Sequence, residues 1–320
     1  MSLTNMKVFN AQLQTMTIET LAQQVEKFNA ASAGALVLTT QGFEGDYRFE
    51  NFFASLHAAQ RRVDRYASNG SAAATNLAQL QEIGVKVAGG FGPIAWEPAQ
   101  LSWVQANPAA ALEAISRNLS EAIMKDQLNT AIAAAVAAIE AQGSANVYDT
   151  GTGPITYADI NLAHAKFGDS SSLLVADIMD GTQYHALVGQ NLTNTAQLFT
   201  FNSVRIVDFL GKRIVVTDAP ALRETGTGAD VKVLSLVAGG ATVYDGSDLI
   251  TNIETSNGLL RISTTMQADY AFGLALKGFQ WDTAAGGKSP TDAELATGSN
   301  WDKVATSHKH TAGVLTLGNI

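Results

Sequence analysis

The residues best able to do chemistry are a few histidines and aspartates in the second half of the chain. His308 and His310 flank one lysine, a spacing that in a strand places both imidazoles on one side, as a metal site would require. The polar segment around them offers no third ligand, so we expect no metal. Asp177 and Asp180 lie near the end of a predicted strand and could form a carboxylate pair for acid–base catalysis. Turn formation accounts for Asp180 more simply.

The other candidate motifs are incomplete. His164 and His185 lie in predicted helices without a serine or aspartate at an informative spacing, so we expect both to serve in packing. The Thr-Gly-Thr-Gly segments at 150–153 and 225–228 fit neither a phosphate-binding loop nor a dinucleotide fingerprint. No nucleophile-elbow, zinc-protease or calcium-loop signature occurs. The residues therefore predict no cofactor and no enzyme activity, with a soluble α/β enzyme that uses the aspartate pair as an alternative.

Composition narrows the class of protein further. Of the 320 residues, 46% are hydrophobic. Only 15% are charged, whereas charged residues make up roughly a quarter of an average protein. So few charges are typical of a surface that partners cover. The net charge of −9 argues against binding nucleic acid by neutralising its phosphates. The chain has no cysteine, signal segment or 18-residue apolar run, so we expect a soluble protein of intracellular origin, without a membrane partner.

One element dominates the predicted structure, a helix over residues 108–142. Asn107 suits the N-cap, Pro108 the first turn, and Gly143 the position just past the end. Between them alanine, the strongest helix former, is frequent, and no glycine or proline intervenes. At 1.5 Å per residue this helix would be roughly 50 Å long.

The apolar residues of this helix form two stripes. The first comprises Leu112, Ile115, Leu119 and Ile123, and the second comprises Leu128, Ile132, Val136 and Ile139. At about 100° per residue, the five-residue step between them places the two stripes on roughly opposite sides. We therefore predict a helix whose two halves bury opposite faces, unless it kinks near Lys125.

The segment before the helix predicts a projecting hairpin. A strand over residues 35–40, a turn over 41–46 and a returning strand over 47–53 carry many apolar side chains, including Phe43 and Tyr47, with little sequence left to cover them. A neighbouring subunit would supply that cover. Ahead of the hairpin, an arm with one short helix over 20–28 is too thin to fold alone.

A basic cluster follows the hairpin. Arg61, Arg62 and Arg65 lie in a predicted helix over residues 54–67. In so acidic a chain the cluster is a candidate contact between subunits, although a solvated helix face explains it equally well. Two strands, broken at Gly89 and Gly90, then lead to the long helix.

In the second half of the chain, the sequence pattern predicts an α/β subdomain followed by a strand-rich region. An α/β subdomain has helix, strand, helix, strand and strand over residues 156–164, 172–176, 182–190, 199–208 and 211–218. Further strands are predicted over residues 232–236, 241–244, 250–255, 259–266 and 271–281, with a hairpin turn at 256–258. Since no second run of helices accompanies these strands, we expect them to pack on the long helix.

This order of elements resembles the major capsid proteins of tailed bacteriophages, which have the Hong Kong 97-type fold. Three stretches carry a local resemblance, namely residues 85–94 before the long helix, 118–139 within it, and 209–218. The resemblance implies an α+β, Hong Kong 97-like capsid fold. Its parts would be a long spine helix over 108–142, an extended β-hairpin loop, an α/β axial domain and a β-rich peripheral domain.

The same resemblance divides the chain into five parts. These are an N-terminal arm (1–34), an extended loop with approach strands (35–97), a peripheral domain (98–149 plus 236–282), an axial domain (150–235) and a C-terminal tail (283–320), in which Trp301 and residues 314–317 are candidate anchors.

The function implied is that of a structural protein. Such proteins self-assemble as hexamers and pentamers into an icosahedral head around double-stranded DNA, with the extended loop over the neighbouring subunit. Arg61, Arg62, Arg65, Phe43 and Tyr47 would then be contact residues. Scaffold, portal and decoration proteins are further candidate partners, no sequence-specific nucleic-acid binding is expected, and the location would be the virion after assembly in the host cytoplasm. An encapsulin-like protein compartment of the same fold is the alternative.

Overall fold

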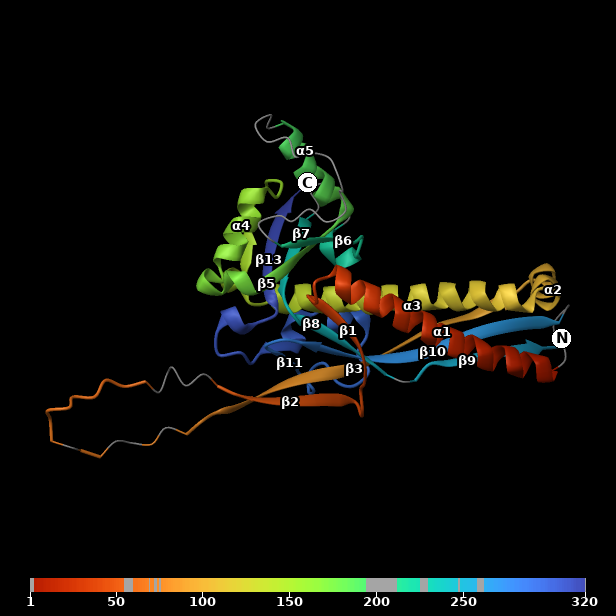
Figure 1. Ribbon diagram of the computed structural model, residues 1–320, viewed down its shortest axis with the longest axis horizontal. Helices are drawn as coiled ribbons and strands as arrows, with labels where there is room; N and C mark the ends of the chain where they lie inside the picture. The colour runs from red at the N-terminus through yellow and green to blue at the C-terminus, as the bar shows by residue number, and fades with distance from the viewer. Residues whose placement is uncertain are drawn as a thin grey trace.

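A computed structural model describes residues 3–54, 60–68, 70–71, 74, 76–193, 212–224, 230–246, 248–257 and 262–319. Figure 1 shows an elongated molecule in which a long helix runs beside two β-sheets and a long segment projects from one end. The predicted strand over 199–208 and the segment 225–228 lie outside the described residues.

The long helix is present as α3, Pro108–Glu140, and it is unbroken at Lys125. Gly143 follows it with a φ of +57°, a left-handed conformation that glycine adopts freely. Asn107 does not cap α3 with its side chain, which instead donates to the carbonyl of Trp103 at 3.4 Å. Local sequence signals therefore predicted this helix to within two residues, except for the nature of its N-cap.

A short helix that was not predicted precedes α3. This helix, α2, covers Pro98–Ala106 and has a proline at its first position. Its signal in the sequence was a capping box, in which Glu97 and Gln100 bond each other's backbone N–H groups.

The prediction that the two halves of α3 bury opposite faces is wrong. Leu112, Leu119 and Ile123 are buried as expected, but this face continues past Ile123. The buried residues of the continuation are Gln127, Thr130, Ala131, Ala134 and Ala138. Ile132 and Val136 on the second face are buried too, so the C-terminal half is covered on both sides. The continuation was missed because large apolar side chains alone defined the stripes.

The N-terminal arm is a single helix, α1, Leu3–Ala31, and not the short helix predicted over 20–28. It lies along α3, and the hydroxyl of Ser120 donates to the carbonyl of Thr17 at 2.9 Å. Phe9 and Leu13 are buried in the same core as α3. The arm is therefore ordered by packing, which its polar, Gln- and Thr-rich sequence did not reveal.

The larger sheet has the strand order β1-β8-β10-β3-β2, and β9 also pairs with β10. Its strands are β1 (Leu36–Gly42), β2 (Tyr47–Phe53), β3 (Gln79–Trp96), β8 (Ala241–Asp245), β9 (Ile250–Ser256) and β10 (Ser263–Leu276). The β1–β8 pair is parallel and the others are antiparallel. The predicted pairing within residues 250–266 is confirmed as β9–β10 for the described residues, and the second strand continues to Leu276.

The hairpin predicted from residues 35–53 is wrong. Its two strands, β1 and β2, lie at opposite edges of the larger sheet, and β2 pairs instead with β3. The connection between them crosses the sheet because Phe43 bonds Asp245 through its backbone and is buried beside Gly273. The projecting segment is therefore the one between β2 and β3, residues 54–78, of which 54, 60–68, 70–71, 74 and 76–78 are described.

The break predicted in β3 at Gly89 and Gly90 is absent. A Cβ on Gly89 would lie 2.7 Å from Cζ of Tyr270, and one on Gly90 would lie 2.7 Å from Oδ1 of Asp269. These glycines make room for the side chains of β10 on an unbroken strand.

The smaller sheet has the order β4-β13-β7-β5-β6. Its strands are β4 (Val147–Asp149), β5 (Leu174–Met179), β6 (Arg213–Val216), β7 (Asp230–Val237) and β13 (Gly313–Asn319), and its helices are α4 (Tyr157–Ala165) and α5 (Gly181–Thr193). Thr156 caps α4 as predicted, in a capping box with Asp159. The segment 283–320 is not a peripheral tail, because β13 lies inside this sheet between β4 and β7.

The remaining C-terminal elements close the core next to α3. They are β11 (Phe279–Trp281), α6 (Asp292–Leu295) and β12 (Trp301–Lys303). Trp301 is buried as predicted and meets the ring of Trp281 edge-on, with centroids 4.9 Å apart.

Candidate assembly surfaces

The α/β subdomain contains a buried group of polar side chains that resembles a catalytic set only in composition. The Nε2 atom of His164 lies 3.0 Å from Oδ1 of Asp177 and 3.1 Å from Oγ of Ser235. A catalytic serine and aspartate would engage the two different ring nitrogens, whereas here both partners meet the same one. All three residues are buried. The group therefore holds α4 against β5 and β7 and has no geometry for proton relay.

The histidine pair and Asp180, the other candidates for metal binding or catalysis, make contacts that stabilise local structure. His308 and His310 lie in a 3-10 turn and not in a strand, and Nε2 of His308 is 3.1 Å from the carbonyl of Lys166. Within the described residues, no three His, Asp or Glu side chains gather as a metal site would require. Asp180 accepts the N–H of Thr182 at 3.0 Å at the start of α5, as its turn position predicted.

The extended segment, residues 54–78, is exposed at every described residue from 60 to 78. Its described residues 60–64 form no helix, so the predicted helix over 54–67 is wrong where it can be judged, and residues 55–59 lie outside the described part. An isolated helix of this length is marginal in water, and nothing described in this chain packs on the segment. Arg61, Arg62 and Arg65 are exposed there, beside the fully exposed ring of Tyr66.

The two aromatic residues predicted to contact another subunit, Phe43 and Tyr47, differ in exposure. Phe43 is 4% exposed and packs against Tyr244 within its own chain, so it has almost no surface to offer a neighbour. This corrects the expectation that Phe43 contacts another subunit. Tyr47 is half-buried on the edge strand β2, beside Phe49. A role for Tyr47 and the three arginines in subunit contact stays a prediction.

Charged side chains meet at the base of the β2–β3 hairpin. Glu50 and Glu82 are directly opposite each other in the antiparallel register. Arg48 bonds Glu50 at 2.8 Å and lies over the ring of Tyr244. Glu82 accepts the N–H of Gly278 at 2.7 Å. Burial raises the pKa of Glu82, the N–H of Gly278 lowers it, and the charge of Glu50 raises it further, for a net rise above the ordinary value.

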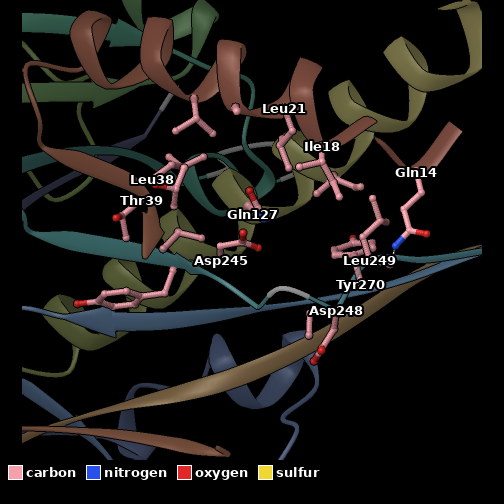
Figure 2. Close-up of a pocket in the computed structure, with 17 residues that line it drawn as sticks. Gln14, Ile18, Leu21, Leu38, Thr39, Gln127, Asp245, Asp248, Leu249 and Tyr270 are labelled. Atoms are coloured by element: carbon pink, nitrogen blue, oxygen red, sulfur yellow. Dashed lines mark hydrogen bonds between the residues drawn. The ribbon is translucent and has the colours of Figure 1, made fainter. Parts of the chain in front are cut away.

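A cavity of about 280 Å³ lies between α1 and the larger sheet (Figure 2). Most of its wall is apolar, with Ile18, Leu21, Val25, Leu38, Ile123, Val243 and Leu249 among the lining residues. Gln127 of α3 also lines it and is 7% exposed. Asp245 and Asp248, both exposed, lie at its edge.

No helix among the described residues is both long and apolar enough to cross a membrane.

The fold is shared with solved phage capsid structures. A chain of the cyanophage Pam1 capsid asymmetric unit matches with a TM-score of 0.54 at 12% identity, covering 89% of this chain and 88% of its own length. A chain from Mycobacterium phage Bobi matches with a TM-score of 0.54 at 12% identity, covering 88% of both chains. At such identities the likeness defines the fold class, which is that of the phage capsid proteins.

The sequence comparisons define the family. The model of the Gp13-like family, described as major capsid protein 13-like, matches residues 5–315, and the chain belongs to this family. The major capsid protein of Bacillus phage SPP1 is 29% identical over 143 residues, which are 44% of this chain and 44% of that protein. The match thus spans less than half the length of this curated relative.

Proposed function

We propose that the chain is the structural subunit of a tailed-phage head and assembles from its own copies. Hexamers and pentamers would form an icosahedral shell around double-stranded DNA. The observation that carries this proposal is the extended segment, whose exposed apolar side chains Val63, Tyr66 and Leu77, like Phe53 at the end of β2, have no cover within the described chain. Such a surface is a liability in a monomer and is explained when another subunit covers it.

The parts of the molecule have distinct roles in this proposal. The smaller sheet with α4 and α5 would act as an axial domain around each capsomer centre. The spine helix α3 and the larger sheet would form the peripheral domain. The extended segment would lie over the neighbouring subunit, bringing Tyr47 and the three arginines to the contact.

The role is structural and not catalytic. Family membership supports this, as does the arrangement of His164, Asp177 and Ser235, which lacks a relay geometry. Assembly would take place in the host cytoplasm, with scaffold, portal and decoration proteins as further partners. The net charge of −9 fits an inner wall that faces DNA without binding its sequence.

Assembly state tests the proposal directly. The purified protein should form megadalton particles of uniform size by multi-angle light scattering, visible as closed shells by negative-stain microscopy. A monomer or dimer under every assembly condition would contradict the proposal. Particles from producing cells should contain DNA, whereas particles filled with a cargo protein would identify a compartment shell instead.

A further inference from the structure

One edge of the larger sheet is bordered by a helix in place of a further strand. The strands β8 and β9 pair with successive parts of β10 on the side opposite β3, and β1 pairs with the outer side of β8. Both β1 and β9 therefore lie along one edge, and α1 runs beside them (Figure 1). Such an edge carries backbone N–H and C=O groups that no strand of the sheet can pair.

Near the C-terminal end of α1, side chains bond the backbone of β1. The side-chain amide of Asn29 donates through Nδ2 to the carbonyl of Leu38 at 2.6 Å, and its Oδ1 accepts the N–H of Leu38 at 2.9 Å. Just past the helix, the hydroxyl of Ser32 donates to the carbonyl of Leu36 at 3.1 Å. Asn29 thus makes the pair of hydrogen bonds that a neighbouring strand would make.

The N-terminal part of α1 bonds the β9 end of the same edge. Asn10 donates through Nδ2 to the carbonyl of Thr251 at 2.5 Å, and its Oδ1 accepts the hydroxyl of Thr251 at 2.8 Å. Gln14 donates to the carbonyl of Leu249, just before β9, at 2.5 Å. The polar side chains of α1 therefore cover both ends of an edge that would otherwise be open.

The attachment of α1 is uneven along its length. Phe9 and Leu13 are buried, but the helix then crosses the cavity described above, where Ile18 is 49% exposed. The connection from α1 to β1 turns at Ala33 and Gly34, with φ angles of +54° and +72°. An alanine is strained in this left-handed region, so a turn that must hold Ala33 there favours a change of conformation.

We propose that α1 is a hinged strap, which opens as one unit about Ala33 and Gly34 and which, when closed, keeps the edge of β1 and β9 from pairing with another copy of the chain. Opening would free the N–H and C=O of Leu38. Because alternate residues of a strand direct these groups to opposite sides, the β1–β8 ladder does not hold the groups that face Asn29. Two opened copies would associate through their uncovered edges.

A removable lock tests whether α1 opens as one unit, because the chain has no native cysteine. Asn10→Cys with Thr251→Cys places a disulfide between α1 and β9, at the end of the helix far from the hinge. Hydrogen exchange is then followed at the amide of Leu38, near the hinge. The oxidised lock should slow this exchange at least about tenfold relative to the reduced form of the same variant.

The amide of Phe272, in the central strand β10, is the internal control because its exchange requires wider unfolding. A disulfide that only stabilises the whole fold would slow Leu38 and Phe272 equally. Equal slowing, or no slowing of Leu38, would overturn the strap. The first result would assign the exposure of Leu38 to wider unfolding, and the second to local fraying beside the hinge.

A second variant tests the guarding role without a lock. Asn29→Ala removes both bonds to Leu38, whereas Gln23→Ala changes an exposed amide of the same helix and is the matched control. Under conditions that keep the wild-type subunit monomeric, Asn29→Ala should associate at least about tenfold faster by light scattering. Equal association of the two variants would overturn the guarding role. Both tests use free subunits, so failure of the wild-type chain to form particles would count against the proposed function alone.

Discussion

At the scale of single residues, several polar and small side chains of this protein serve the packing of one element on another. His164 bonds Asp177 and Ser235 through one ring nitrogen, which fastens a helix to a sheet. Gly273 lacks a Cβ at the point where the ring of Phe43 rests, so the crossing from β1 to β2 can lie flat on β10. Side chains that a motif search singles out for chemistry are thus explained by packing.

Glu82 is an exception, because its environment opposes its charge. Its pKa in the folded chain is raised above the ordinary value of 4.5, chiefly by burial. Between these two pKa values the folded state binds more protons than the unfolded state, so stability increases as pH falls through this window. Glu82→Gln should remove that gain and should raise the free energy of unfolding at neutral pH by about 0.2–1 kcal/mol, the scale of a cross-strand charge pair.

Urea unfolding of dissociated subunits at several pH values measures this effect. Glu113→Gln, an exposed glutamate on α3, is the matched control for loss of one negative charge. An unchanged pH slope in Glu82→Gln, or a loss of stability at neutral pH, would show that the pair does not oppose folding.

At the scale of elements, the sequence predicted what neighbouring residues encode. The helices α3 and α4 and the β9–β10 hairpin follow from caps, turns and periodicity within short windows. The β1–β8 pair joins residues 36 and 241, and no local signal specifies such a partner. The hairpin error had this origin, because residues 35–53 have the pattern of a hairpin whether or not their strands pair.

Of the candidate surfaces, one could be recognised from the local sequence and one could not. The arginine cluster stands out by composition alone, so it was named from the sequence. The cavity was not predictable, because Ile18, Gln127 and Leu249 come together only when α1, α3 and the segment before β9 are packed. The one available signal for Tyr66 was an aromatic residue among arginines, in a segment predicted to be helical.

The buried alanines of α3 lead to a prediction about packing. Ala134 is completely buried where α3 is covered on both sides. Ala134→Leu should reduce the free energy of unfolding by about 1–3 kcal/mol, since an enlarged side chain must displace its neighbours. Ala114→Leu, on the exposed side of the same helix, should change it by less than about 0.5 kcal/mol. Denaturant unfolding of subunits compares the two, and equal effects would mean that α3 is loosely covered.

At the scale of the whole molecule, the basic cluster should matter for assembly and not for folding. Changing Arg61, Arg62 and Arg65 to glutamate should lower particle yield at least about tenfold, since complementary charge would become repulsion. The subunit's unfolding free energy should change by less than about 0.5 kcal/mol, because the residues are exposed. Light scattering and denaturant unfolding measure the two quantities.

The control for this prediction makes the same charge change elsewhere. Arg117, Lys125 and Lys303 are exposed outside the extended segment. Their replacement by glutamate should lower the particle yield less than the replacement of the three arginines of the extended segment. Equal loss of particles in both triple variants would attribute the effect to net charge and not to the extended segment.

The position of β13 makes closure of the smaller sheet depend on residues that are distant from its other strands in the chain. Because this strand lies between β4 and β7, the sheet is incomplete until residues 313–319 take their place. A variant without these residues would present two unpaired strand edges where β13 belongs. Such edges readily pair with strands of other chains, so loss of β13 should lead to aggregation.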